Sequence, residues 1–204
     1  MGKSPIFCAP RILAVAAVAS LLSLPALASG SHAGGHGDGH GGGHGGGMAM
    51  QGQPGEAANV SRTVNVVMHD NSYEPGSISV KPGETVRFKI RNAGELVHEF
   101  NIGTAAMHAD HQEEMMMMMQ QGVLMPDHID RMAARHMQKT MGHGMHNDPN
   151  SVLLEPGQSG EVIWTFPKQA AAEIEFGCNV PGHYQSGMHG QFRMPGQPHT
   201  SGGS

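Results

Sequence analysis

The sequence predicts an all-β sandwich that is interrupted by one long, partly helical insertion. Apolar and polar residues alternate in about seven short segments between residues 62 and 194. Proline and glycine turn signals separate these segments, and the alternation stops between residues 104 and 150. Charged residues make up 14% of the chain, against about 25% in typical soluble domains. This composition argues against a charged helical bundle or a coiled coil.

Residues 1–28 have the pattern of a secretory signal peptide. Lys3 and Arg11 precede an apolar run that ends in an Ala-Leu-Ala cleavage site at Ala28. The alternative, a membrane anchor, is disfavoured because the run contains Pro25 and is barely long enough to span a bilayer. We therefore expect export to the periplasm, cleavage after Ala28, and no membrane attachment of the mature chain.

Residues 29–60 contain mainly small and polar residues with almost nothing to bury, so we expect them to be disordered. Histidines recur in this segment at every fourth position: 32, 36, 40 and 44. The segment is either a solvated linker or a flexible chelator of copper or another divalent ion, and the regular repeat favours the chelator. Residues 197–204 are expected to form a flexible tail.

The region that follows, 61–196, holds the predicted strands. They begin near Arg62 and continue over 77–80, 85–91, 96–102, 161–166, 172–176 and 190–194. The clearest is 85–91, where Val86, Phe88 and Ile90 face one side and charged residues face the other. Short strands separated by Pro/Gly turns indicate an antiparallel sandwich of one domain.

The insertion 104–150 contains 11 of the 17 methionines and six of the 15 histidines. Loops of this length are uncommon in compact domains and are usually functional or disordered. We expect Asp127 to cap a helix that runs to Met141 and ends at Gly142. Upstream of this helix, histidines and methionines also recur at helical spacing.

Two interpretations fit the histidines and methionines that share helical faces in this insertion. The candidate metal-binding residues are His108, His111, Met115 and Met118 in the upstream stripe and His128, Met132 and His136 in the downstream one. A methionine stripe is ordinarily core packing, but the five consecutive methionines 115–119 cannot all face one core. Because thioethers bind Cu(I) well and have no proton to lose, we favour an auxiliary copper-binding segment.

The C-terminal loop carries three potential ligands in the pattern Cys-x4-His-x4-Met, formed by Cys178, His183 and Met188. Cys178 is the only cysteine that remains after signal cleavage, so the mature chain has no internal disulfide to make. A blue-copper site needs two histidines, one cysteine and a weak axial methionine. The second histidine must come from elsewhere: His98 is the best candidate and His69 the alternative. His189, beside Met188, is either a surface residue or an entry ligand, and we favour the surface.

At these residues the chain resembles the cupredoxins, the small blue-copper proteins such as plastocyanin, azurin and rusticyanin. The resemblance covers about 61–195 and implies a Greek-key sandwich with one type 1 copper on His98, Cys178, His183 and Met188. It also implies outer-sphere one-electron transfer, with a redox partner docking near His183. Where several cupredoxins have Asn or Ser after the first histidine, this chain has Glu99.

The His- and Met-rich additions are similar to those of periplasmic copper-tolerance cupredoxins of the CopI type. The expected function is therefore an exported, monomeric copper protein that serves copper tolerance or homeostasis. The alternatives are a dedicated periplasmic electron carrier and a Cu(I) metallochaperone. We expect no enzymatic activity, since the sequence lacks a nucleophile–base signature and the His-x-His pairs of a multicopper oxidase. A formal net charge of −5 argues against a nucleic-acid partner, because such binding relies on positive charge that neutralises phosphates.

Overall fold

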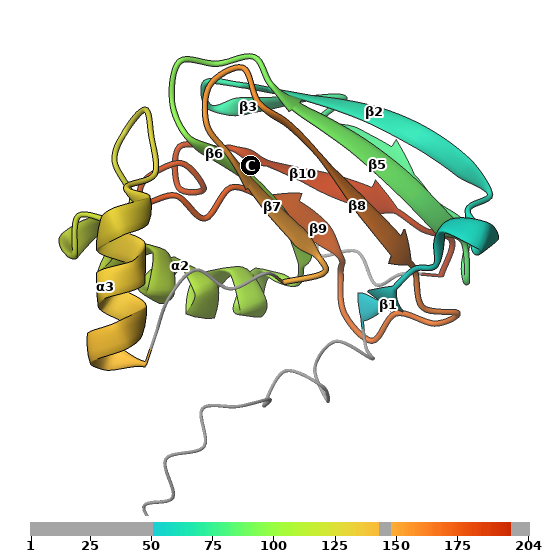
Figure 1. The fold of residues 1–204 in the computed structure, drawn as a ribbon. Coiled ribbons are helices and arrows are strands. Elements are labelled where there is room, and N and C mark those ends of the chain that lie inside the picture. Colours follow the sequence, from blue (N-terminus) through green and yellow to red (C-terminus); the bar gives the residue numbers. More distant parts are fainter. Residues whose placement is uncertain (1–50, 143–147, 197–204) are drawn as a thin grey trace, which may run out of the picture. The chain divides into compact units, whose positions relative to one another are not determined.

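The computed structural model describes residues 51–142 and 148–196, and Figure 1 shows their arrangement. The expected signal peptide, the four histidines at 32–44 and the expected tail at 197–204 lie outside the described residues. Part of the segment expected to be disordered is ordered: β1 (Gln53–Pro54) pairs with a strand of the sandwich, and η1 (Ala57–Asn59) is a 3-10 turn. The prediction of disorder up to residue 60 is therefore wrong for this stretch.

Two five-stranded sheets form the sandwich, which confirms the predicted fold class. The first sheet has the order β1-β8-β5-β2-β3, with β2 at Arg62–His69, β3 at Ser72–Glu74, β5 at Thr85–Asn92 and β8 at Ser159–Thr165. The second has the order β4-β10-β9-β6-β7, with β4 at Ser77–Ser79, β6 at His98–Gly103, β7 at Ser151–Leu154, β9 at Glu175–Gly177 and β10 at His189–Arg193. Figure 1 shows the two layers.

The sheets are mixed, so the prediction of an antiparallel sandwich is wrong for two strand pairs. β2 pairs in parallel with β5, and β4 pairs in parallel with β10. Between β2 and β5 the chain passes through β3 and then β4, which lies in the other sheet. That excursion provides the crossover that two parallel neighbours require. The short strands β3 and β7 were not predicted, and the strand expected over 172–176 begins only at Glu175.

The core lies between the sheets and is built on the alternation that predicted β5. Val86, Phe88 and Ile90 are all buried. The ring of Phe88 lies 5.5 Å from that of Phe100 on β6 and 5.6 Å from that of Phe192 on β10, measured between centroids. Such tilted aromatic contacts join the two sheets beneath the strand ends that carry the candidate ligands.

Two helices form the insertion, α2 (Ala105–Gln120) and α3 (Arg131–Met141). Gly142 ends α3 in the left-handed conformation, as predicted, with its N–H bonded to Gln138 O. The predicted cap at Asp127 is wrong. The carboxylate of Asp130 accepts from the backbone N–H groups of Met132 and Ala133 instead, which is the geometry of an N-cap. Within the described residues, no helix combines the length and the apolar character needed to span a membrane.

Each predicted stripe of the insertion has a different outcome. The upstream stripe forms the inward face of α2, where His108, Met115 and Met118 are buried. The exposed α2 methionines are Met116, Met117 and Met119. In the downstream stripe, the prediction that His128 shares a helical face with Met132 and His136 is wrong, because α3 begins only after Asp130.

Candidate metal centre

The loop between β9 and β10 is closed on itself by backbone hydrogen bonds. Cys178 N donates to Met188 O over 3.1 Å, and Met188 N donates to His183 O over 3.0 Å. Gly182 and Gly187 have φ angles of 87° and 100°, which residues other than glycine rarely adopt. The loop therefore presents Cys178 and His183 from one compact turn, against the start of β6 at His98.

Three candidate ligand atoms meet at this point. His98 Nδ1 lies 3.2 Å from His183 Nδ1 and 3.9 Å from Cys178 Sγ, and His183 Nδ1 lies 3.4 Å from Cys178 Sγ. A point equidistant from all three lies about 2 Å from each, close to the length of metal–imidazole and metal–thiolate bonds. Two imidazoles and one thiolate are the trigonal donor set of a blue-copper centre, so the residues present fit a copper ion.

The environment of Cys178 favours a thiolate only when a cation is bound. Its side chain is buried, and burial raises the pKa of the thiol to about 12 despite a backbone N–H donated to sulfur by Glu99 at 3.4 Å. A metal ion at the equidistant point would compensate the thiolate charge that burial otherwise penalises. Binding is therefore coupled to release of the thiol proton.

Asp70 orients His98 from the turn after β2. His98 Nε2 lies 2.8 Å from Asp70 Oδ1, and because a carboxylate only accepts, Nε2 carries the hydrogen. The lone pair of the neutral ring then lies on Nδ1, the atom that faces Cys178 and His183. The hydrogen bond to His98 in turn lowers the pKa of Asp70. Backbone N–H groups of Glu95 and Leu96 hold the same carboxylate in place.

Both candidate imidazoles are in the state that binds metal ions. Burial lowers the pKa of His98, and burial together with the nearby His98 lowers the pKa of His183. His98 is fully buried, whereas His183 is only partly buried. His69, the alternative upstream ligand, is absent from the group: its side chain is 48% exposed and lies 3.5 Å from Glu74.

Met188 is buried and is held in the loop through its backbone. Its neighbour His189 is exposed and stacks on Tyr184, with ring centroids 4.8 Å apart, so it lies at the surface as we expected. Tyr184 also donates a short hydrogen bond to Glu175.

The sequence pattern predicted neither the contact of Asp70 with His98 nor the surroundings of Glu99. The Glu99 carboxylate accepts from Asn179 Nδ2 at 2.8 Å and from Asn179 N at 3.3 Å. It lies 3.0 Å from His111 Nε2 on α2. A carboxylate within the apolar stretch 96–100 was the available signal, since a buried charge requires partners.

The candidate auxiliary residues are dispersed. Both ring nitrogens of His111 face carboxylates, of Glu99 and Glu114, whereas His108 bonds to Asn179 through Nδ1 and its buried Nε2 has no hydrogen-bond partner. Met115 and Met118 are packed in the core. The remaining three are exposed: His128, which pairs with Asp127 at 2.7 Å, Met132 and His136. In the described part of the chain, one group brings together three or more His, Cys, Asp or Glu donor atoms within 4.8 Å of one another. It consists of His98, Cys178 and His183.

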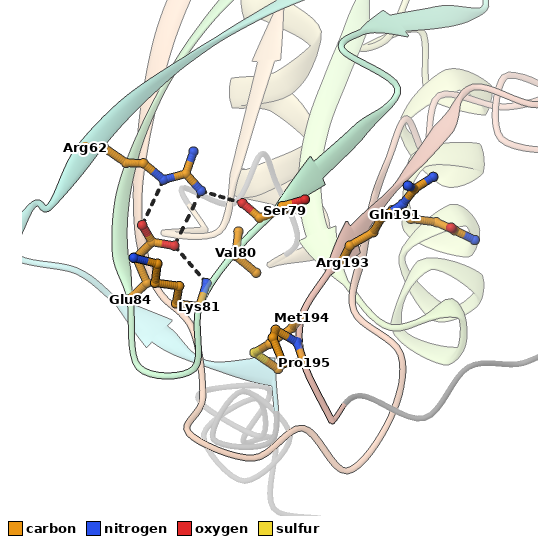
Figure 2. A pocket seen from close by; sticks show the side chains of 9 residues that line it. All are labelled: Arg62, Ser79, Val80, Lys81, Glu84, Gln191, Arg193, Met194 and Pro195. Carbon is orange, nitrogen blue, oxygen red and sulfur yellow. Dashed lines mark hydrogen bonds and ion pairs between the residues drawn. The ribbon is translucent and has the colours of Figure 1, made fainter.

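A separate groove, shown in Figure 2, is lined by none of the candidate metal-binding residues. Arg62 Nε lies 2.8 Å from Glu84 Oε1, and Arg62 Nη2 donates to Ser79 O at 2.5 Å. Glu84 also accepts the backbone N–H of Lys81 at 2.8 Å. These contacts fasten β2 to the turn between β4 and β5, so the charged groups on this side of the groove have partners within the fold.

Comparisons with known proteins place the chain among copper proteins. Residues 46–113 match the model of the cupredoxin-like domain. The chain is 51% identical over 153 residues to the copper-resistant cuproprotein CopI of Pseudomonas aeruginosa, covering 70% of this chain and 81% of that one. It is 39% identical over 141 residues to CopI of Rubrivivax gelatinosus, covering 69% and 70%. Among solved structures, reduced auracyanin from Roseiflexus castenholzii matches with a TM-score of 0.46 and 21% identity, over 66% of this chain and 98% of that one.

Proposed function

Because this chain belongs to the family of CopI-type cupredoxins, we propose that it is an exported copper protein that protects cells against excess copper through one type 1 centre. Its ligands in this proposal are His98, Cys178 and His183, with Met188 as a weak axial fourth. The observation that carries the proposal is the convergence of two imidazole nitrogens and one sulfur around a point at bonding distance from all three.

Copper bound at this point would supply reversible one-electron chemistry. The protein's own residues hold the donors in place: Asp70 fixes the tautomer of His98, and the hydrogen-bonded loop keeps Cys178 beside His183. A donor set that is held rigidly needs little rearrangement when the charge of the metal changes. His183 is the partly exposed ligand, so its edge is the proposed route for electrons to a redox partner.

Two further parts of the proposal rest on other observations. Export rests on the signal-peptide pattern of residues 1–28. Additional Cu(I) capacity rests on the exposed α2 methionines, whose thioethers face solvent instead of the core. This capacity favours copper tolerance over the alternative, a dedicated electron carrier, which would need only the sandwich and the His183 surface.

The visible spectrum of the copper-loaded mature protein tests the type 1 centre. We expect an intense thiolate-to-copper band that Cys178→Ser abolishes and that His98→Gln removes or shifts. His69→Gln is the matched control, because His69 is a half-exposed histidine at the end of β2 and lies outside the ligand group. A colourless wild type with full copper occupancy would refute the assignment.

Growth under copper stress tests the biological role. A deletion strain should regain tolerance with the wild-type chain and lose most of it with Cys178→Ser. Replacement of the exposed α2 methionines by leucine should lower tolerance further in either background. Full tolerance with all of these changes combined would move the proposal to the dedicated electron carrier.

A further inference from the structure

Helix α2 reaches the metal loop through two histidines on its inward face. His111 Nε2 lies 3.0 Å from Glu99 Oε1, and His108 Nδ1 lies 3.1 Å from Asn179 Oδ1. Glu99 directly follows His98, and Asn179 directly follows Cys178. Each of these α2 histidines therefore contacts the chain neighbour of a proposed copper ligand.

The carboxylate of Glu99 is the centre of this network and is only 1% exposed. Oε2 accepts two hydrogen bonds from Asn179, and Oε1 accepts from Asn101 Nδ2 at 3.4 Å as well as from His111. Four hydrogen-bond donors face the two oxygens of this buried carboxylate. The buried side chain is therefore an ionised carboxylate that ties β6 to the Cys178 loop.

His111 supplies the opposite charge. Its Nδ1 lies 3.0 Å from Glu114 Oε2, so both ring nitrogens face carboxylates, and both must donate. Burial lowers the pKa of His111, but the two carboxylates outweigh burial and raise it to about 9. An imidazolium on α2 thus lies against a carboxylate beside the metal loop.

We propose that α2 is a positioning element of the metal centre, in which the Glu99–His111 pair holds the Cys178 loop and its two charges shift the reduction potential of the bound copper in opposite directions. This inference rests on the proposed type 1 centre and adds to the interpretation of the insertion as a copper-binding segment. A buried carboxylate stabilises the more positive, oxidised copper, whereas a buried imidazolium stabilises the reduced form. Because the two charges are on different elements, each can be removed separately.

The test is the one-electron potential of copper-loaded Glu99→Gln, His111→Gln and the double variant, measured by voltammetry at about pH 6, well below the pKa of about 9 of His111. Glu99→Gln should raise the potential and His111→Gln should lower it. Each change should alter the ratio of Cu(I) to Cu(II) affinities about tenfold, equivalent to about 59 mV for one electron. The double variant should return close to the wild type. Glu113→Gln, an exposed carboxylate-to-amide change on the same helix, is the matched control and should shift nothing.

A purely structural role would shift the potential of both single variants in the same direction, and that result would overturn the inference. If either variant fails to fold, Glu114→Gln replaces it, because it leaves the Glu99–His111 contact intact and removes only the outer, half-exposed carboxylate. The imidazolium of His111, no longer paired with Glu114, should then raise the potential. An unmoved potential would overturn the inference. A colourless wild type would refute the proposed function, whereas a blue wild type with unmoved potentials would refute this inference alone.

Discussion

Asp70 offers the sharpest test of how the protein prepares His98 for metal binding. Its carboxylate accepts the Nε2 hydrogen of His98 at 2.8 Å and the backbone N–H groups of Glu95 and Leu96, which lie between β5 and β6. Asp70→Ala removes the acceptor of all three hydrogen bonds, so His98 loses the contact that fixes its tautomer and ring orientation. Asp70→Asn keeps an acceptor oxygen and removes only the charge.

The expected loss follows from the contacts. Removing an outer partner of a ligating histidine typically weakens metal affinity about 10- to 100-fold. The side chain of Asp70 is 39% exposed, so solvent screens its charge and the lower end applies. We expect Asp70→Ala to weaken Cu(II) affinity about tenfold, equivalent to about 1.4 kcal/mol, and Asp70→Asn to weaken it less.

Competition with a Cu(II) chelator, followed through the visible band, measures this loss. Asp127→Ala is the matched control, because Asp127 bonds to the exposed His128 at 2.7 Å in a similar Asp–His pair far along the chain. The control should retain wild-type affinity. Equal affinities for Asp70→Ala and Asp127→Ala would refute the reasoning that Asp70 prepares His98.

Three further predictions concern the axial ligand, the insertion and pH. Met188→Leu should keep the blue band and raise the reduction potential, since oxidised copper loses an electron-donating contact; an unchanged potential in voltammetry would place Met188 away from the metal. Replacing the exposed α2 methionines by leucine should lower the number of Cu(I) ions bound in chelator competition, whereas the buried Met115→Leu should not, and equal numbers for both would exclude these methionines as ligands. The raised pKa of His111 stabilises the folded state below the ordinary histidine value of 6.5, and this contribution is lost as the pH rises through about 9. Urea unfolding of the metal-free protein at pH 6.5 and 9.5 should therefore show a smaller pH-dependent loss for His111→Gln than for the wild type, and identical losses would contradict the assigned charge.

The candidate ligands illustrate what sequence can predict. Cys178, His183 and Met188 are close along the chain, so their spacing alone places them in one loop. His98 required a choice against His69, and the burial of the strand around it supported that choice. The alternation in β5 likewise predicted its buried face, because a strand places every second side chain on the same side.

The parts that were missed depend on contacts between distant residues. Glu99 and His111 lie on a strand and a helix whose docking no local pattern encodes. The parallel pairing of β2 with β5 follows from the excursion of β4 into the other sheet, which periodicity does not reveal. The start of α3 was predicted too early because Asp127 and Asp130 are both capable caps, and only Asp130 has its carboxylate at the helix N-terminus.

A crystal structure of the copper-loaded protein, with anomalous scattering recorded at the copper edge, tests the central claim most directly. We predict one strong anomalous peak at about 2 Å from His98 Nδ1, His183 Nδ1 and Cys178 Sγ, the bonding distance that these atoms already allow. At one equivalent of copper, a peak located on α2 or α3 with none between these three atoms would contradict the account.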